Sequence, residues 1–267
     1  MVIADVPIWE SCPVWVSYAL TFVFVISVIN GINFSDGMDG LAGGTILMSL
    51  ALVFILASES TNYRIVIIAV TVCAALIGFL RFNTFPAKIF MGDVGSQFLG
   101  FSVAWASITV SQGETSSMTT LMPLLILGIP VIDIIQVIIV RLHKQLPLPG
   151  PDKEHIHHQI AKLGLYHYEV VAIIYALHSI LLIGAYELRF ATDVVVATFF
   201  VAYSVTVLGA LLIAHSNGFR FREGTVQTYA RRNQFFRRIG LLHPYSGKFY
   251  GVMIFLTMLS TALLSSP

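Results

Sequence analysis

Charge is scarce in this sequence. Only 11% of its 267 residues are Asp, Glu, Lys or Arg, whereas 57% are hydrophobic, and the mean hydropathy is +0.84. A soluble domain of this size needs far more charge to cover its surface. The composition therefore excludes an ordinary soluble protein and places the chain among membrane proteins.

Cysteine is equally scarce. Cys12 and Cys73 are the two cysteines of the chain, and more than sixty residues separate them. Neither a disulfide framework nor a zinc site of cysteine pairs can be built from two such residues. The net charge of +1 gives no indication of a nucleic-acid partner.

Long apolar stretches are what the sequence has in abundance. About 17–25 apolar residues suffice to cross the hydrocarbon core of a bilayer as a helix. Eight such spans are predicted, at residues 13–30, 41–57, 64–81, 95–112, 119–140, 168–187, 193–214 and 249–265. The segment 216–248 differs, because its six arginines are interleaved with phenylalanines, which is typical of a segment lying at a membrane surface.

The basic residues are distributed unevenly between the two sides of these spans. If the spans alternate, thirteen of the fifteen lysines and arginines fall on one side, and only Arg64 and Arg189 fall on the other. The richly basic side is cytoplasmic by the positive-inside rule. We therefore predict an all-α, polytopic protein of the inner (plasma) membrane. It forms a single transmembrane domain over 1–267, with its N-terminus outside and 216–248 as a basic cytoplasmic interfacial segment.

Three polar segments are predicted on this cytoplasmic side. They read INGINFSDGMDGLAGG (29–44), RFNTFPAKIFMGDVGS (81–96) and RLHKQLPLPGPDKEHIHHQIAKLG (141–164). Together they supply carboxylates, a lysine, glycine-rich backbone and three histidines. Segments so far apart in sequence, meeting at one face, indicate a composite site in cytoplasmic loops.

The first two segments also have simpler interpretations. Asp36 or Asp39 in DGMDG would cap the following span, with glycines supplying positive φ, although one cap needs only one carboxylate. Asp93 in MGDVGS would be the N-cap of the fourth span. Backbone N–H groups at such a helix start also bind phosphate, so capping and ligand binding are compatible there.

Histidines and one buried carboxylate complete the candidates. His155, His157 and His158 lack the second cluster that a zinc site requires, and their ordinary pKa near 6.5 suits phosphate binding or proton transfer. Asp133 lies inside the fifth predicted span, where charged groups are costly and are functional candidates. An inward structural hydrogen bond explains Asp133 as well as direct catalysis does.

These parts are typical of phosphate chemistry at a membrane surface. Mg²⁺ binds one or two carboxylates and completes its shell with waters and substrate phosphates. Phosphoryl transfer requires that the charge on the phosphoryl group be neutralised and that the nucleophile be held in line. A site at the bilayer surface implies one water-soluble reactant and one lipid.

With these motifs in order, the sequence resembles the polyprenyl-phosphate N-acetylhexosamine-1-phosphate transferases (glycosyltransferase family 4). The resemblance rests on NGINFSDGMDG, FMGDVGS and HIHH, each between predicted spans. The form HIHH, with Pro130 and Asp133 in the span before it and Arg141 after, is closest to the N-acetylglucosamine branch. That branch starts wall teichoic acid and O-antigen chains.

The resemblance implies a reaction and roles for individual residues. A lipid phosphate would attack the sugar-bearing phosphorus of a UDP-sugar and release UMP. Asp93 would bind Mg²⁺, or Mn²⁺ in its place. The catalytic residues would be Asp36, Asp39, His155, His157 and His158, and the substrate-binding residues would be Asn30, Asn33, Lys88, Phe90 and Arg141, with Phe90 stacking on uracil. The partners would be the UDP-sugar, a polyprenyl phosphate and membrane lipid, with a homodimer left open.

The sequence departs from the family at its N-terminal side. Family members carry an adjacent pair of aspartates in an earlier cytoplasmic loop and have more spans, whereas this sequence contains no Asp-Asp pair. We expect either a catalytically incomplete fragment of a full transferase or a short protein that needs a partner. On that basis we expect little or no transferase activity from the chain alone.

Two other classes of function compete with a transferase. A transporter requires interrupted spans and midplane charges in both halves of the chain, whereas here only Asp133 is predicted to lie deep. A non-catalytic membrane scaffold would use the arginine-rich segment 216–248 to hold anionic lipid or a partner. Loss of Mg²⁺-dependent turnover on replacing Asp93 would separate the transferase from the scaffold.

Overall fold

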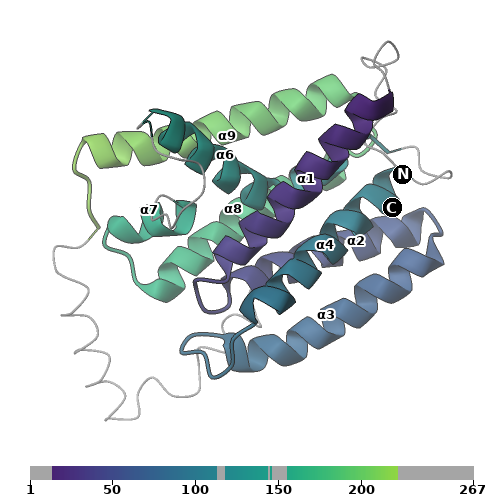
Figure 1. Ribbon diagram of the computed structural model, residues 1–267, viewed down its shortest axis with the longest axis horizontal. Helices are drawn as coiled ribbons and strands as arrows, with labels where there is room; N and C mark the ends of the chain where they lie inside the picture. Colours follow the sequence, from purple (N-terminus) through teal and green to yellow (C-terminus); the bar gives the residue numbers. More distant parts are fainter. Residues whose placement is uncertain (1–13, 113–117, 144, 146–154, 222–267) are drawn as a thin grey trace.

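The computed structural model describes residues 14–112, 118–143, 145 and 155–221, and all regular secondary structure in those ranges is helical (Figure 1). Helices satisfy every backbone polar group within one segment, which a hydrocarbon environment demands. The elements are α1 (Val14–Ser35), α2 (Leu41–Glu59), α3 (Tyr63–Asn83), α4 (Gly92–Ser111), α5 (Met122–Ile126), α6 (Gly128–His143), α7 (Ile156–Lys162), α8 (His167–Glu187) and α9 (Asp193–Ser216).

Five of these helices are long and apolar enough to cross a membrane, namely α1, α2, α3, α8 and α9. The prediction of an all-α, polytopic membrane protein is confirmed. Helix α4 covers the fourth predicted span but carries polar residues in its first turns. The eighth predicted span, 249–265, and the larger part of 216–248 lie outside the described residues.

The fifth predicted span is not one helix, and that prediction is wrong. The helix breaks at Leu127 between α5 and α6. Pro130 has no N–H to donate to the carbonyl oxygen of Ile126, four residues earlier. The Ser49 hydroxyl from α2 donates to that oxygen instead (2.9 Å), and His178 Nε2 lies 2.9 Å from the same hydroxyl. A buried polar brace therefore stabilises the break.

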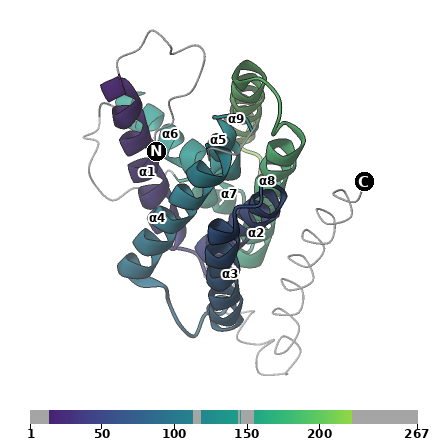
Figure 2. The ribbon, with the colours of Figure 1, turned by 90° about the vertical axis from the view of Figure 1, so that its right-hand side faces the viewer.

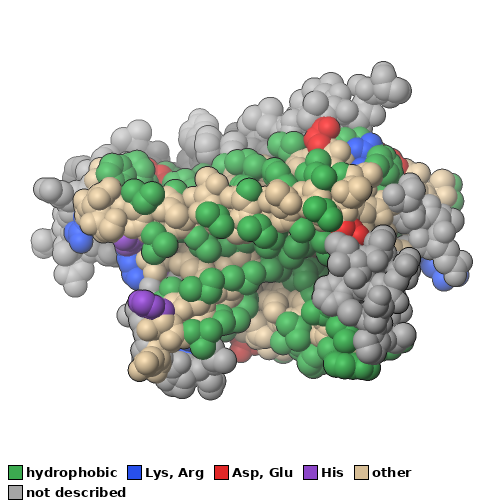
Figure 3. Space-filling model, turned by 90° about the horizontal axis from the view of Figure 1, so that it is seen from above, with side chains coloured by type: hydrophobic (Ala, Val, Ile, Leu, Met, Phe, Trp, Pro, Cys, Tyr) green, Lys and Arg blue, Asp and Glu red, His purple; other side chains and the backbone are tan. Residues whose placement is uncertain are grey.

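Helix α2 lies at the centre of the bundle. In its apolar window 78% of the residues are buried, against 17–44% in the other four candidate spans. Helices α1 and α4 pack side by side, and α2 and α3 form a second pair (Figures 1 and 2). The face shown in Figure 3 carries hydrophobic side chains over much of its area, as a surface in contact with lipid requires.

Small residues let the helices approach closely. A Cβ on Gly31 of α1 would lie 2.7 Å from the carbonyl oxygen of Pro130, and one on Gly100 of α4 would lie 3.0 Å from the Cα of Ile29. Such contacts are characteristic of helix packing in membranes. They fix α6 and α4 against α1 just before the residues that begin the candidate site.

Polar contacts also join the helices at the end of the bundle that lies away from the three polar segments. Arg189, after α8, pairs with Glu59 at the end of α2 (3.3 Å) and lies over the Tyr186 ring. Asp193, at the start of α9, accepts hydrogen bonds from the Thr119 hydroxyl (2.5 Å) and the Leu121 N–H (3.3 Å). These contacts join the three turns at that end, about 30 Å of helix away from the candidate site.

Candidate active site

The turn between α1 and α2 does not use its aspartates as helix caps. The N-cap of α2 is Gly40, in the left-handed region (φ 81°), without a side-chain cap. Its N–H donates to Asn83 Oδ1 (3.0 Å), and its carbonyl accepts the Tyr175 hydroxyl (2.5 Å). The capping interpretation of Asp36 and Asp39 is therefore wrong, because other elements hold the turn in place.

Asp39 connects this turn to the α3–α4 loop. Its Oδ2 accepts the Ala87 N–H at 2.9 Å, and its carbonyl lies 3.3 Å from His167 Nε2 at the start of α8. The His167 ring stacks on Phe85, with 4.6 Å between ring centroids. Asp39 thereby ties together the ends of three helices.

A second contact joins the same two segments. Helix α1 continues to Ser35, so Asn30 and Asn33 lie in the helix and not in the predicted loop. Asn33 accepts the Ser96 hydroxyl of α4 at 2.6 Å. Asp93 lies exposed in the first turn of α4, whose N-cap residue is Met91, so the interpretation of Asp93 as the N-cap is wrong.

Asp36 lies within electrostatic reach of two other carboxylates from these two segments. Burial raises the pKa of Asp36 above its ordinary value, and the negative charges of Asp93 and Asp39 raise it further, whereas a backbone hydrogen bond from Gly92 opposes the shift. Like charges gathered in this way disfavour ionisation and favour a cation between them.

This donor set fits Mg²⁺. Among the described residues no group of three or more His, Cys, Asp or Glu side chains forms a complete metal cage. Mg²⁺ does not need one, since it keeps waters and binds substrate phosphates alongside one or two carboxylates. Exposed Asp93 with half-buried Asp36 beside it offers that arrangement.

The histidine segment is anchored by Asp133. One carboxylate oxygen, Oδ2, lies 2.7 Å from His155 Nδ1, and the other, Oδ1, accepts the Ile156 N–H at 2.6 Å. Asp133 and His155 are each only 3% exposed. Of the two interpretations of Asp133, the inward hydrogen bond is the one observed.

The three histidines form a stack beside the α1–α2 turn. The centroid of the His155 ring lies 4.5 Å from that of Phe34 and 5.8 Å from that of His157, and the His158 ring lies 4.1 Å from that of His157. His157 and His158 lie on the short helix α7, not in the predicted loop.

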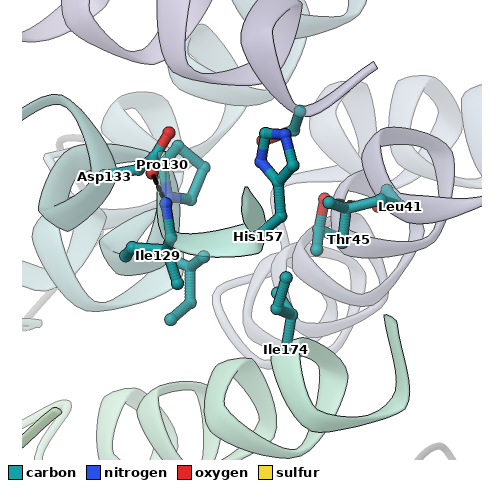
Figure 4. Close-up of a pocket in the computed structure, with 9 residues that line it drawn as sticks. Leu41, Thr45, Ile129, Pro130, Asp133, His157 and Ile174 are labelled. Carbon is teal, nitrogen blue, oxygen red and sulfur yellow. Dashed lines mark hydrogen bonds between the residues drawn. The ribbon is translucent and has the colours of Figure 1, made fainter. Parts of the chain in front are cut away.

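His157 points into a small pocket at the base of this stack (Figure 4). The pocket is lined by Ser35, Leu41, Thr45, Ile129, Pro130, Asp133, Ile156, His157 and Ile174. His157 Nε2 is buried and has no hydrogen-bond partner within the described part of the chain. A Cβ on Gly37 would lie 3.9 Å from that nitrogen, so His157 faces the DGMDG turn.

Comparison with known proteins agrees with this geometry. Residues 4–111 match the family described as glycosyl transferase family 4. That match contains both the α1–α2 turn and the start of α4, which together hold the three carboxylates. The part of the chain that carries these carboxylates is therefore similar to this family.

Curated proteins similar to this chain carry related names. A probable undecaprenyl-phosphate N-acetylglucosaminyl 1-phosphate transferase of Bacillus subtilis is 38% identical over 178 residues, or 67% of this chain and 50% of the relative. A decaprenyl-phosphate N-acetylglucosaminephosphotransferase of Mycobacterium leprae is 34% identical over 63% of this chain and 47% of its own length. An undecaprenyl-phosphate alpha-N-acetylglucosaminyl 1-phosphate transferase of Escherichia coli K12 is 32% identical over 58% and 44%. The chain thus spans about half the length of the curated relatives it matches.

The other substrate-binding residues that the family resemblance implies lie at the edge of the site or away from the three carboxylates. Lys88 and Phe90 project from the α3–α4 loop, with Phe90 74% exposed. Arg141 is buried at the end of α6. Asn30 is exposed, and its amide donates to the Ile26 carbonyl one turn back (2.8 Å). Substrate binding by these four residues stays a prediction.

Three residues of the site escaped sequence reasoning. Asn83, His167 and Tyr175 hold the α1–α2 turn. Asn83 lies in the polar segment 81–96, so its position in the sequence marked it as a candidate. Its side-chain amide binds two backbone groups. His167 and Tyr175 lie in or beside an apolar span and gave no signal, because only the packing of α8 on α2 brings them to the turn.

Burial gives His157 a distinct pH dependence. Burial, and then the neighbouring His158, lower the pKa of His157 from 6.5 to about 4. Below pH 6.5 the unfolded chain binds a proton that the folded chain excludes, so stability is lost as the pH falls from 6.5 toward 4. We expect His157→Gln to reduce this loss in thermal unfolding between pH 4 and pH 7. Exposed His143→Gln is the control, and equal pH dependence in both variants contradicts the prediction.

Proposed function

We propose that this chain carries the site for transfer of N-acetylglucosamine-1-phosphate, or a related N-acetylhexosamine-1-phosphate, from a UDP-sugar to polyprenyl phosphate, with release of UMP. The main observation in support is the meeting of Asp36, Asp39 and Asp93 with a histidine stack at one end of the bundle. The names of the family relatives support the same reaction.

The chemistry is a single displacement at phosphorus. An oxygen of the lipid phosphate forms a bond to the phosphorus that carries the sugar. The bond from that phosphorus to the bridging oxygen of UDP breaks, and the bridging oxygen leaves with UMP. The product is a lipid-linked pyrophosphate, and the step requires charge neutralisation and in-line positioning.

The position of each residue suggests its role in this reaction. Asp93, with Asp36 beside it, would hold Mg²⁺, which supplies charge neutralisation at the pyrophosphate. His157 faces the turn and, with His158 next to it, would contact phosphate. Lys88 and Phe90, exposed beside Asp93, would bind the phosphates and the uracil ring of the nucleotide.

We further propose that the site faces the cytoplasm at the plasma membrane. In the topology predicted from the sequence, thirteen of the fifteen basic residues fall on the same side as Asp36, Asp93 and the histidines. The opposite end carries Arg189, paired with Glu59. This asymmetry supports a cytoplasmic site by the positive-inside rule.

UMP release tests the proposal. Membranes containing the chain are supplied with UDP-N-acetylglucosamine, undecaprenyl phosphate and Mg²⁺, and UMP and lipid-linked sugar are measured together. The names of the relatives favour an active transferase over the incomplete fragment that the missing Asp-Asp pair led us to expect. We therefore expect turnover that is lost in Asp93→Asn and kept in Glu187→Gln, an exposed carboxylate at the opposite end of the bundle. Turnover that survives Asp93→Asn, or no turnover with the unsubstituted chain, argues against the proposed function. In the second case, binding of anionic vesicles would favour the scaffold.

A further inference from the structure

We propose that Asp133 is a positioning residue for the histidine segment: its carboxylate orients the His155 ring and, through it, the stack that faces the α1–α2 turn. The expected effect on catalysis rests on the proposed function. The positioning of His155 by Asp133 rests on geometry alone. Asp133 itself does not face the turn, since both of its oxygens are directed at the histidine segment.

The first support is that a single carboxylate holds both the side chain and the backbone of the same segment. Oδ2 is 2.7 Å from His155 Nδ1, and Oδ1 accepts the Ile156 N–H at 2.6 Å. Ile156 is the first residue of α7, whose N-cap side chain makes no capping bond. Asp133 therefore supplies from another helix the acceptor that the start of α7 lacks.

The second support is the effect on the His155 ring. In the tautomer that donates to a carboxylate, Nδ1 carries the proton, and this hydrogen bond restrains the rotation of the ring. The ring also contacts Phe34, tilted by 33°, and a nearly parallel His157, with 9° between the ring planes. Rotation of His155 would therefore disturb the ring that faces Gly37.

The third support is that close packing on α1 fixes the position of α6 along that helix. Pro130, three residues before Asp133, packs on Gly31 so closely that a Cβ there would lie 2.7 Å from its carbonyl oxygen. Gly31 and Phe34 are one turn apart on α1. The same helix pair thus places both the carboxylate and the aromatic ring that hold His155.

A carboxylate buried to this extent is costly unless it is fully paired. Here the carboxylate is paired with the histidine segment and joins two elements that the chain separates by 22 residues. A purely structural role predicts lower stability when the carboxylate is removed. A positioning role predicts, in addition, a change at His155 and a loss in kcat that depends on His155.

The test uses the full chain in nanodiscs, with Asp133→Asn, Asp133→Glu, His155→Gln and the double variant Asp133→Asn/His155→Gln. Glu59→Gln is the matched control, since Glu59 is a carboxylate that bridges helix ends away from the site. Histidine ¹⁵N NMR, with His155→Gln assigning the signal, reports the protonation of Nδ1. UMP release reports kcat and KM separately.

We expect Asp133→Asn to change the His155 Nδ1 signal and to lower kcat by about 10–100-fold, the range for removing the group that orients a functional histidine, with KM for the UDP-sugar little changed. The double variant should be no slower than His155→Gln alone, because both changes remove one interaction. Asp133→Glu should restore part of kcat.

Three results overturn the inference: an unchanged Nδ1 signal in Asp133→Asn, multiplicative losses in the double variant, or an equal kcat loss in Glu59→Gln. If Asp133→Asn does not fold, the Nδ1 signal and kcat of Asp133→Glu decide in its place. If no form releases UMP, the proposed function fails while the NMR result still decides whether Asp133 orients His155.

Discussion

Replacing Asp36 with Asn should strongly slow transfer and at the same time make the metal-free protein more stable. Burial and the charges of Asp93 and Asp39 raise the pKa of Asp36, so the fold disfavours its ionised form. An amide keeps the size and an oxygen acceptor for the Gly92 backbone but carries no charge. The variant therefore removes the repulsion between Asp36 and the two neighbouring carboxylates. The native protein keeps this repulsion because function requires the charge.

The sign of the pH dependence follows from the raised pKa. Below the ordinary value of 3.8, Asp36 is protonated in both the folded and the unfolded chain, and its ionisation costs no stability. As the pH rises through the folded pKa, the unfolded chain releases its proton more readily, and the native protein loses stability relative to Asp36→Asn. The difference in unfolding temperature between the two proteins should thus be present at pH 7 and disappear as the pH falls below 3.8.

Thermal unfolding in the presence of a chelator measures the stability effect, and UMP release with Mg²⁺ measures the activity. We expect turnover to fall by about 10²–10³-fold, the range for removing one electrostatic group from an active site. Glu187→Gln is the control that removes a charge without removing this cluster. An Asp36→Asn protein that is less stable than its parent at pH 7 would contradict the electrostatic account.

Much of the site could be predicted from sequence because it depends on topology. Span lengths and the distribution of basic residues place 29–44, 81–96 and 141–164 on one face, and helices of matching length then bring Asp36, Asp93 and His157 to the same end of the bundle. The exact ends of α1 were less predictable. Polar residues at 30–35 suggested a loop, yet Asn30 and Ser35 return their hydrogen bonds to the carbonyls one turn back, which helices permit.

Partners across the bundle could not be predicted. The sequence around Asp133 does not show that His155 is its partner. The pairing depends on the helix break at Leu127 and on the position of α6 along the axis of α1. The caps expected from Asp39 and Asp93 failed for a related reason. A turn that other helices hold through Asn83 and Tyr175 needs no local cap, so its carboxylates are left for other contacts.

Gly44→Ala should destabilise the protein severely, although it adds one methyl group. A Cβ on Gly44 would lie 1.7 Å from the hydroxyl oxygen of Tyr175 and 2.3 Å from its Cζ, so the ring cannot stay where it is. Tyr175 is 5% exposed and its hydroxyl donates to the Gly40 carbonyl. Displacing it costs about 1–3 kcal/mol of packing and releases the turn that carries Asp36 and Asp39, so activity should fall with stability.

The same substitution elsewhere provides the control. Gly78→Ala lies in a membrane-length helix, α3, with no atom within 4 Å of the added Cβ. Alanine is a better helix former by about 0.5–1 kcal/mol, so this variant should be as stable as the parent or more so. A loss of stability of similar size in both variants would show that the clash with Tyr175 is not the cause.

Two further variants separate packing from the hydrogen bond. Tyr175→Leu in the Gly44→Ala background removes the clash and should recover much of the unfolding temperature in detergent, but not the bond to Gly40. Tyr175→Phe alone keeps the ring and removes only the hydroxyl. If the turn depends on that bond, both proteins should share a reduced rate of UMP release while differing in stability, because each lacks the same donor at the Gly40 carbonyl. Full activity in Tyr175→Phe would instead assign the turn's position to Asn83 and Asp39, which hold it from the other side.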